Sequence, residues 1–254
     1  MPESYPIEFD FPINVHRMIK GEREYVENEI STILKTIREY EEPDERIITK
    51  IILETCYLND NQKKLVCKWA KKYGADFVKT STGFGPGGAT LEDVQLMKDA
   101  AHPLEVKAAG GIKSFDKMKE YTAAGVTRIG TSSGPKIMME ALKAIGETQK
   151  LREYASMIDH TNLRPEADDR SILNTCWEAK TYDFKAVCVR PEYMAIVVGD
   201  LKRTEVKPCI AIGFENLKEK DRDGLLGTKR YDVDLDRKLY EVEECMRVFR
   251  EITQ

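Results

Sequence analysis

Asp76-Phe-Val-Lys79-Thr-Ser-Thr-Gly83 is an apolar run, typical of a buried strand, that ends on a lysine and breaks into small and polar residues. Glu105-Val-Lys107-Ala-Ala-Gly-Gly111 repeats this pattern further along the chain. A lysine in such a place is costly because burial disfavours its charge, and the usual outcome is a lowered pKa and a nucleophilic amine. Two such lysines on consecutive strands predict an enzyme that forms a Schiff base.

Each lysine by itself has a simpler explanation, because a lysine after an apolar run is most often a solvated strand end. The pair changes this interpretation. If the two strands are parallel neighbours, both ammonium groups emerge at the same edge of the sheet. Like-charge repulsion would then lower the pKa of each of them.

Strand-like runs alternate with amphipathic helical stretches from one end of the chain to the other. Strands are expected near 5–13, 47–54, 75–80, 104–109, 126–131, 155–159, 184–189 and 206–212. Helices are expected near 22–41, 60–73, 90–101, 114–123, 134–151, 168–182, 191–201 and 233–252. Plausible N-caps for three of these helices are Asp60, Thr90 and Ser114. This alternation predicts a closed (β/α)₈ barrel, and the 254 residues, 1–254, are expected to form that one domain.

An open doubly wound sheet is the alternative fold, because Gly83-Phe-Gly85-Pro-Gly-Gly88 matches a dinucleotide-binding G-x-G-x-x-G fingerprint. Such a fold needs an acidic residue at the end of its second strand to hold the ribose. Here that strand ends on Lys107-Ala-Ala-Gly110. Pro86 also removes a backbone donor from the middle of the loop. The barrel is therefore the favoured fold, and no cofactor is expected.

The composition argues against several classes of protein. The formal charge is −4 with acidic and basic residues intermixed, which is not typical of a nucleic-acid-binding groove. No apolar run reaches the ~18 residues of a membrane span, and the start of the chain lacks the basic and apolar regions of a signal peptide. The six cysteines form no CxxC motif and the three histidines form no cluster. Neither a disulfide framework nor a metal site is expected, and a cytoplasmic location is predicted.

The active site of a (β/α)₈ barrel lies where the strands end, at their carboxyl side. The residues expected at these positions are Asp10, Glu54, Lys79, Lys107, Ser132, Asp159 and Cys188. Glu8 and Asp10 alternate with apolar neighbours and should share a face that points into the barrel. An acid paired there with a lysine could be purely structural, but an acid beside an amine is also how proton relays are built.

Two loops of small residues are typical of phosphate binding. Gly110-Gly111 follows one strand, and Gly130-Thr-Ser132-Ser133-Gly134 follows the next and leads directly into a helix. Small residues expose backbone N–H groups, serines add hydroxyl donors, and the positive end of the helix dipole favours an anion. One Gly/Ser loop is just a turn in most proteins, but two of them in these positions match the place where barrels commonly bind phosphate.

Seven motifs together are more specific than any of these features. Four lie in the first half: Ile-Leu-Glu-Thr-Cys56, Lys79-Thr-Ser-Thr-Gly-Phe-Gly-Pro-Gly-Gly88, Val106-Lys107-Ala-Ala-Gly-Gly-Ile112 and Thr127-Arg-Ile-Gly-Thr-Ser-Ser-Gly134. Three follow: Ile158-Asp159-His-Thr161-Asn-Leu-Arg-Pro-Glu-Ala167, Ala186-Val-Cys188-Val-Arg-Pro191 and Ala211-Ile-Gly-Phe214. The first four closely resemble the C-terminal half of the deoxyribose-phosphate aldolase family, and the other three look like its N-terminal third. The resemblance covers nearly the whole chain.

The order of these segments departs from that family. Residues 1–134 resemble its C-terminal part and residues 151–254 its N-terminal part, so the resemblance implies a circularly permuted barrel. A closed barrel permits this because its first and eighth strands are neighbours, and residues 134–154 can supply the connection between them. The chain also departs locally, in a charged loop at 215–230 and in His16-Arg17, where the family usually has small residues.

The resemblance implies a class I aldolase that reversibly cleaves 2-deoxy-D-ribose 5-phosphate to D-glyceraldehyde 3-phosphate and acetaldehyde, without metal or cofactor. By motif matching, Lys79 would form the Schiff base, Lys107 would lower its pKa, and Asp10 would move protons with Lys107 and water. Substrate contacts are implied for Asp159, Thr161, Thr82 and Cys188. Phosphate contacts are implied for Gly110, Gly111, Gly130, Ser132 and Ser133, with Thr82 beside them.

Two other functions stay open. A different class I aldolase would use the same lysines on another phosphosugar, and the space beside Cys188 and Asp159–Thr161 would decide between donors of different length. A non-catalytic barrel that binds phosphosugars is the second, although such a protein needs no buried pair of amines. The expected partners are a small phosphosugar and aldehydes, with no nucleic acid and no membrane. The sequence leaves the oligomeric state open, a homodimer or higher homo-oligomer included.

Overall fold

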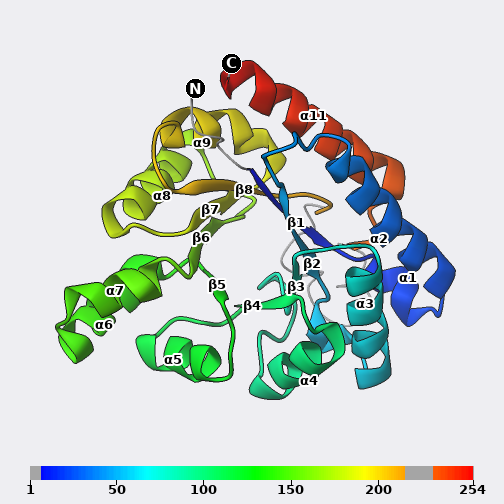
Figure 1. The fold of residues 1–254 in the computed structure, drawn as a ribbon, viewed down its shortest axis with the longest axis horizontal. Helices are drawn as coiled ribbons and strands as arrows, with labels where there is room; N and C mark the ends of the chain where they lie inside the picture. Colours follow the sequence, from blue (N-terminus) through cyan, green and yellow to red (C-terminus); the bar gives the residue numbers. More distant parts are fainter. Residues whose placement is uncertain (1–6, 215–230, 254) are drawn as a thin grey trace.

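Eight parallel strands form a closed ring in a computed structural model that describes residues 7–214 and 231–253 (Figure 1). Each strand pairs with the next along the chain, and β1 also pairs with β8, which closes the barrel. The strands are β1 Glu8–Pro12, β2 Ile48–Ile52, β3 Phe77–Lys79, β4 Glu105–Ala109, β5 Arg128–Thr131, β6 Ile158–Asn162, β7 Ala186–Val189 and β8 Lys207–Ala211. The predicted (β/α)₈ barrel is confirmed, and the charged loop at 215–230 lies outside the described residues.

Helices surround this ring (Figure 1). They are α1 Val15–Ile19, α2 Arg23–Arg38, α3 Asp60–Lys72, α4 Leu91–Ala101, α5 Phe115–Ala123, α6 Gly134–Ile145, α7 Thr148–Ala155, α8 Asp169–Tyr182, α9 Met194–Leu201 and α11 Leu235–Thr253. Two short 3₁₀ turns, η1 Thr55–Tyr57 and η2 Pro191–Tyr193, follow β2 and β7. The long helices bury one apolar stripe against the barrel, as α2 does with Val26, Ile30, Ile33, Leu34 and Ile37.

Three local expectations are corrected. The helix expected over 134–151 is two helices, because Gly146 adopts φ 68°, a left-handed conformation that ends α6. The N-cap of α3 is Asn59, which forms a capping box with Gln62, whereas Asp60 is already helical. The strand expected over 155–159 runs from Ile158 to Asn162, so Asp159 lies near its beginning. The caps Thr90 and Ser114 are confirmed.

Polar residues fill the barrel interior where Val, Ile and Leu usually dominate. In β1, Phe9 and Phe11 face the helices while Glu8 and Asp10 face inward, and all four are buried. Burial of a charge is tolerable only when the charge is paired and hydrogen-bonded. The interior of this barrel is therefore expected to hold an ion-pair network.

A second buried ion pair joins α11 to α2, which lie side by side on one flank of the barrel (Figure 1). Lys238 Nζ lies 2.7 Å from Glu29 Oε1 and donates to the carbonyl oxygen of Pro12 at 2.9 Å. The other oxygen of Glu29 accepts from the backbone N–H of Asn14 at 2.7 Å. Both charged side chains are fully buried. The pair thus ties the last helix to the carboxyl end of β1, the strand that carries Asp10.

Lys238→Met is expected to lower the free energy of unfolding by about 3–5 kcal/mol, because it leaves the charge of Glu29 buried without a partner. Urea unfolding followed by circular dichroism measures this. The double variant with Glu29→Gln should recover a large part of the loss, since it removes the orphaned charge. A loss below ~1 kcal/mol in Lys238→Met would contradict this role.

Within the described residues, no helix combines the length and the apolar character that a membrane crossing requires.

Candidate functional site

Lys79 and Lys107 lie side by side inside the barrel. Strands β3 and β4 are parallel neighbours, and Lys79 pairs in register with Lys107. Lys79 is the last residue of β3 and is 2% exposed, whereas Lys107 is completely buried in the middle of β4. The juxtaposition expected from the two similar sequence runs is therefore present.

Asp10 joins the two lysines. One carboxylate oxygen, Oδ2, lies 2.6 Å from Lys79 Nζ and 2.7 Å from Lys107 Nζ. The other oxygen, Oδ1, accepts from Lys50 Nζ at 2.8 Å. Burial alone would raise the pKa of Asp10, but the positive charges of Lys107, Lys50 and Lys79 hold it well below its usual range. Asp10 is thus a fixed anion that positions an amine at the cavity and another behind it.

Asp159 forms the second layer of this network. Its Oδ2 lies 2.5 Å from Lys107 Nζ, and its Oδ1 accepts from Arg128 Nε at 2.8 Å. Glu8 completes the layer through ion pairs with Arg128 at 2.6 Å and Lys50 at 2.7 Å. Burial would raise the pKa of Asp159, but Arg128 and Lys107 lower it.

The expected pKa decrease is wrong for Lys107. Burial by itself would lower the pKa of Lys107, but the carboxylates of Asp10 and Asp159 raise it above its ordinary value. Two anions in direct contact outweigh the repulsion from the neighbouring lysines. Lys107 therefore stays positively charged at neutral pH.

Positive groups outnumber acids in this network. Among the described residues it contains four cationic side chains and three carboxyl groups, namely Lys50, Lys79, Lys107 and Arg128 against Glu8, Asp10 and Asp159. Lys107 contacts two carboxylates, whereas the contact of Lys79 is one oxygen that it shares with Lys107. A buried positive charge without a full counter-charge is costly. Lys79 is thus the member whose charge is compensated least.

Lys79 also lines a cavity of about 270 Å³ at the carboxyl end of the strands. The cavity wall brings together residues from the ends of β4, β5 and β6 and from the loops after β3, β4, β5 and β6: Thr82, Gly83, Phe84, Ala109, Gly110, Gly111, Ile112, Lys113, Gly130, Thr131, Ser132, Thr161, Leu163 and Arg164. Six predicted site residues besides Lys79 lie together there, namely Thr82, Gly110, Gly111, Gly130, Ser132 and Thr161. Asp10, Lys107 and Asp159 are not among the residues that line the cavity, and Asp10 is joined to it through Lys79.

The glycines of this wall are needed for their shape. Gly110 and Gly111 have φ values of 90° and 78°, a region that disfavours other residues. A Cβ atom on Gly110 would lie 2.9 Å from Gly88 Cα, and one on Gly130 would lie 2.9 Å from Ala109 Cβ. Such close backbone packing leaves main-chain groups exposed to a ligand, as in known phosphate-binding loops.

Three predicted residues lie elsewhere or are engaged otherwise. Ser133 is the N-cap of α6 and donates its backbone N–H to Thr131 Oγ1 at 2.9 Å, outside the cavity wall. Cys188 is completely buried beside Cys209, whose hydrogen bond lowers the pKa of the Cys188 thiol. Thr82 lines the cavity, but its hydroxyl group donates to Glu54.

Four site residues were missed by the sequence reasoning. Lys50 and Arg128 belong to the ion network, and Lys113 and Arg164 add positive charge to the cavity wall. A signal existed for Lys50, because it interrupts the apolar run Ile48-Thr-Lys-Ile-Ile52 at an inward-facing position. Lys50 lies in the middle of its strand, so a prediction that considers strand ends does not include it.

Asp10, Cys188 and Cys209 lie close enough together to hold a metal ion. However, Lys50 Nζ lies 2.8 Å from Asp10 Oδ1 and 3.5 Å from Cys209 Sγ. An ammonium group thus occupies the space where a cation would bind these atoms, so the residues do not fit a metal site.

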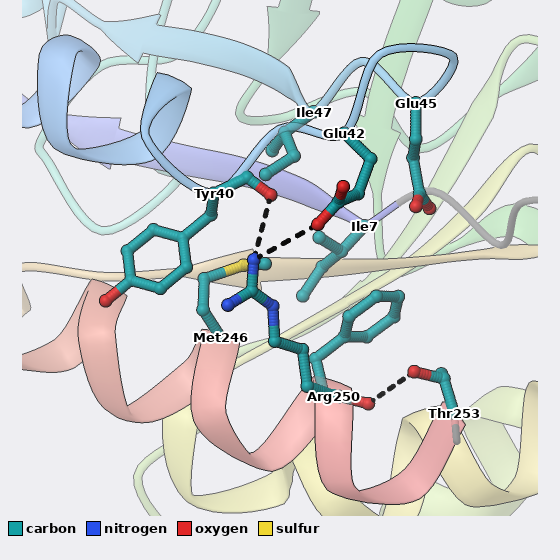
Figure 2. A pocket seen from close by; sticks show the side chains of 9 residues that line it. Ile7, Tyr40, Glu42, Glu45, Ile47, Met246, Arg250 and Thr253 are labelled. Carbon is teal, nitrogen blue, oxygen red and sulfur yellow. Dashed lines mark hydrogen bonds and ion pairs between the residues drawn. The ribbon is translucent and has the colours of Figure 1, made fainter.

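A second cavity, of about 360 Å³, lies at the opposite end of the barrel, where β1 and β2 begin (Figure 2). Its floor is apolar, with Ile7 and Met246 on either side, and Arg250 crosses it to bind the carbonyl oxygen of Tyr40 at 3.4 Å and Glu42 at 3.6 Å. Figure 2 shows Arg250 held by these two contacts. Barrel enzymes carry their chemistry at the carboxyl ends of the strands. The cavity at Lys79 is therefore the candidate active site.

Comparison with known proteins relates about half of the chain to one group of enzymes. No family model matches the chain. Over 134 residues, 52% of this chain, it is 48% identical to a deoxyribose-phosphate aldolase of Caldanaerobacter subterraneus subsp. tengcongensis and covers 56% of that protein. Over 132 residues it is 48% identical to a deoxyribose-phosphate aldolase of Thermococcus kodakarensis and covers 57% of it. The chain thus spans little more than half the length of the curated relatives it matches.

Among solved structures, the tryptophan synthase alpha chain of Legionella pneumophila superposes on 97% of this chain and on 92% of its own length. The TM-score is 0.50 and the sequence identity 6%, so this similarity concerns the barrel fold alone.

Proposed function

We propose that this chain is a class I aldolase that reversibly cleaves 2-deoxy-D-ribose 5-phosphate to D-glyceraldehyde 3-phosphate and acetaldehyde. The observation that carries the proposal is the position of Lys79, an undercompensated amine on the cavity with Asp10 and Lys107 behind it. The homology of about half the chain to deoxyribose-phosphate aldolases supports the choice of substrate.

The reaction would begin when neutral Lys79 attacks the C1 aldehyde of the open-chain sugar. Uptake of one proton and loss of water would then give a protonated imine. Loss of the proton from the C3 hydroxyl breaks the C2–C3 bond, and the imine takes up the electron pair as an enamine. D-glyceraldehyde 3-phosphate leaves, C2 of the enamine is reprotonated, and hydrolysis releases acetaldehyde. Asp10 Oδ2 and Lys107 Nζ lie 2.7 Å apart, and these two groups would pass the protons on through bound water.

The charges of the network favour this sequence. Lys79 shares one carboxylate oxygen with Lys107, whereas Lys107 contacts two carboxylates, so the amine proposed to react is the one whose charge has the smallest counter-charge. Once the imine is protonated, its positive charge lies next to Asp10 Oδ2, which stabilises it electrostatically. Asp159 and Arg128 would act by keeping Lys107 charged and in place.

The cavity wall would hold the phosphate group. Gly110, Gly111, Gly130 and Ser132 offer backbone and hydroxyl donors, and Ser133 would contribute through the first turn of α6. Lys113 and Arg164 add two cations from the loops after β4 and β6. Thr161 would contact a substrate hydroxyl group. Cys188 and Asp159, which are buried in the barrel, would limit the space for the two-carbon donor aldehyde.

The experiment is to incubate the purified chain with acetaldehyde and sodium borohydride, map the peptides, and assay cleavage of 2-deoxyribose 5-phosphate. We expect a reductive ethyl addition on Lys79 together with release of acetaldehyde. Imine trapping without cleavage, but with turnover of another phosphosugar, would favour the different class I aldolase. The absence of both would leave the non-catalytic binding barrel.

Ser132→Glu is expected to raise KM for 2-deoxyribose 5-phosphate by ~10-fold or more, because it brings a negative charge to the proposed phosphate site. KM for unphosphorylated 2-deoxyribose should change little. Steady-state kinetics on both sugars measure the difference. Ser132→Gln, of nearly equal size but uncharged, is the control. Equal effects of Ser132→Glu on both sugars would show that phosphate does not bind here.

The circular permutation is part of the proposal. Two observations support it. The motifs that resemble the family's C-terminal part end at Gly134, and α6 and α7 then join β5 to β6 inside one closed barrel. A chain opened after Gly146, with Gln254 joined to Met1 by a Gly/Ser linker, is expected to keep a comparable kcat. Loss of activity in a folded barrel of this kind would contradict it, since connections at the amino face serve stability.

We further propose that residues 1–254 act as one aldolase domain in the cytoplasm. All six cysteines are free thiols and five are buried, as is common in a reducing compartment. A homodimer or higher homo-oligomer stays a prediction, and light scattering coupled to size-exclusion chromatography tests it.

A further inference from the structure

We propose that Glu54, Thr82 and Tyr231 form an anchor that holds the loop after Lys79, and that Tyr231 is a positioning residue for substrate binding. The proposal rests on the proposed aldolase function. The three residues come from distant parts of the sequence: the turn between β2 and η1, the loop between β3 and α4, and the segment before α11. We call them the Glu54 anchor.

The Glu54 anchor is a closed set of hydrogen bonds. Glu54 Oε2 accepts from Thr82 Oγ1 and from the phenol of Tyr231, and it also accepts from the backbone N–H of Thr82 at 3.2 Å. The two hydroxyl oxygens of Thr82 and Tyr231 are 2.9 Å apart. Glu54 and Tyr231 are buried, so these bonds are shielded from water.

Glu54 is not an ordinary core residue. Its backbone has φ 54° and ψ 63°, a left-handed conformation that is rare for residues other than glycine and that clusters at functional sites. Burial raises the pKa of Glu54, against the effect of its hydrogen bonds to Thr82 and Tyr231. A strained backbone and a buried acid are both costly, and they persist here directly beside the strand that ends on Lys79. Their position points to a role at the cavity.

The anchor is connected to the cavity wall through the loop. Thr82, Gly83 and Phe84 line the cavity, and Phe84 donates its backbone N–H to Thr82 Oγ1 at 3.1 Å. Gly85 packs on the anchor, because a Cβ atom on this residue would lie 3.3 Å from Glu54 Oε1 and 2.9 Å from Cys56 Sγ. A shift of Thr82 would therefore move the wall that faces the substrate.

Aromatic rings make a second connection. The ring of Tyr231 meets Phe214 edge to face at 6.4 Å, and Phe214 meets Phe84 in the same way at 6.4 Å. Tyr231 itself is held from the other side, because its neighbour Asp232 accepts from Asn14 Nδ2 at 3.1 Å. The phenol is thus presented to Glu54 from a backbone that is fixed independently of the loop.

The test compares Tyr231→Phe with Tyr73→Phe. Tyr73 Oη donates to Glu27 Oε1 at 2.8 Å, so the control removes a tyrosine–glutamate hydrogen bond after α3, away from the cavity. We expect Tyr231→Phe to raise KM for 2-deoxyribose 5-phosphate about 5- to 10-fold, the size of one lost hydrogen bond, with kcat changed less than about 3-fold. Tyr73→Phe should leave KM unchanged. Glu54→Gln, which keeps an acceptor, should be milder than Glu54→Ala.

Amide hydrogen exchange of the 80–88 peptide is a readout that does not depend on activity. Exchange at Thr82 should become faster in Tyr231→Phe and stay as in the wild type in Tyr73→Phe. The proposal is overturned if Tyr231→Phe lowers Tm but alters neither KM nor this exchange, or if Tyr73→Phe has the same effects. If wild-type Lys79 traps no acetaldehyde, the aldolase function fails, while the exchange data still decide on the anchor.

Discussion

Replacement of Lys79 by methionine is expected to abolish aldolase activity, with kcat lower by at least ~10⁴-fold, because no other amine among the described residues is placed to act as the nucleophile. Among the residues that line the cavity, Lys113 is the other lysine, and it lies apart from the Asp10 network. Lys107 is fully buried, and its two carboxylate partners keep it protonated.

The measurement combines turnover with borohydride trapping of acetaldehyde and peptide mapping. Lys79→Met should remove the ethyl label together with activity, while Lys113→Ala, the control, keeps the label on Lys79. The free energy of unfolding should change little, since Lys79→Met removes the least compensated cation and leaves Asp10 paired with Lys50 and Lys107. Labelling of Lys107 in the unmodified protein would contradict the assignment of Lys79 as the nucleophile.

Asp10→Asn is expected to lower kcat by ~10² to 10⁴-fold, as for the loss of a general acid–base group, while imine formation at Lys79 remains detectable. The same change leaves three buried lysines facing a neutral amide, so the free energy of unfolding should fall by about 3–5 kcal/mol. Kinetics, trapping and urea unfolding separate these effects.

Glu8→Gln is the matched control for Asp10→Asn. Glu8 lies in the same network and pairs with Lys50 and Arg128, but its ion pairs do not include Lys79 or Lys107. The Glu8→Gln variant should have a lower free energy of unfolding and a nearly unchanged kcat. Wild-type turnover by a folded Asp10→Asn variant would show that the proton relay runs through other groups.

Much of the fold was predictable from local pattern. The eight apolar runs and the helical periodicities between them are properties of neighbouring residues, and each corresponds to an observed strand or to helices. The strand-end position of Lys79, the inward alternation of Glu8 and Asp10, and the glycine loops at Gly110 and Gly130 were readable for the same reason. Where a single residue changed the backbone, as Gly146 does between α6 and α7, boundaries were missed.

The tertiary structure alone decided which charges meet. Lys50 and Arg128 become site residues because closure of the barrel places Asp10, Asp159 and Glu8 against them. The raised pKa of Lys107 has the same origin, since it depends on two acids from strands far apart in the sequence. Tyr231 reaches Glu54 across 177 positions of the chain. Electrostatic and hydrogen-bond energies depend on distances in space within a water-excluded interior, and the sequence specifies those distances only through the complete fold.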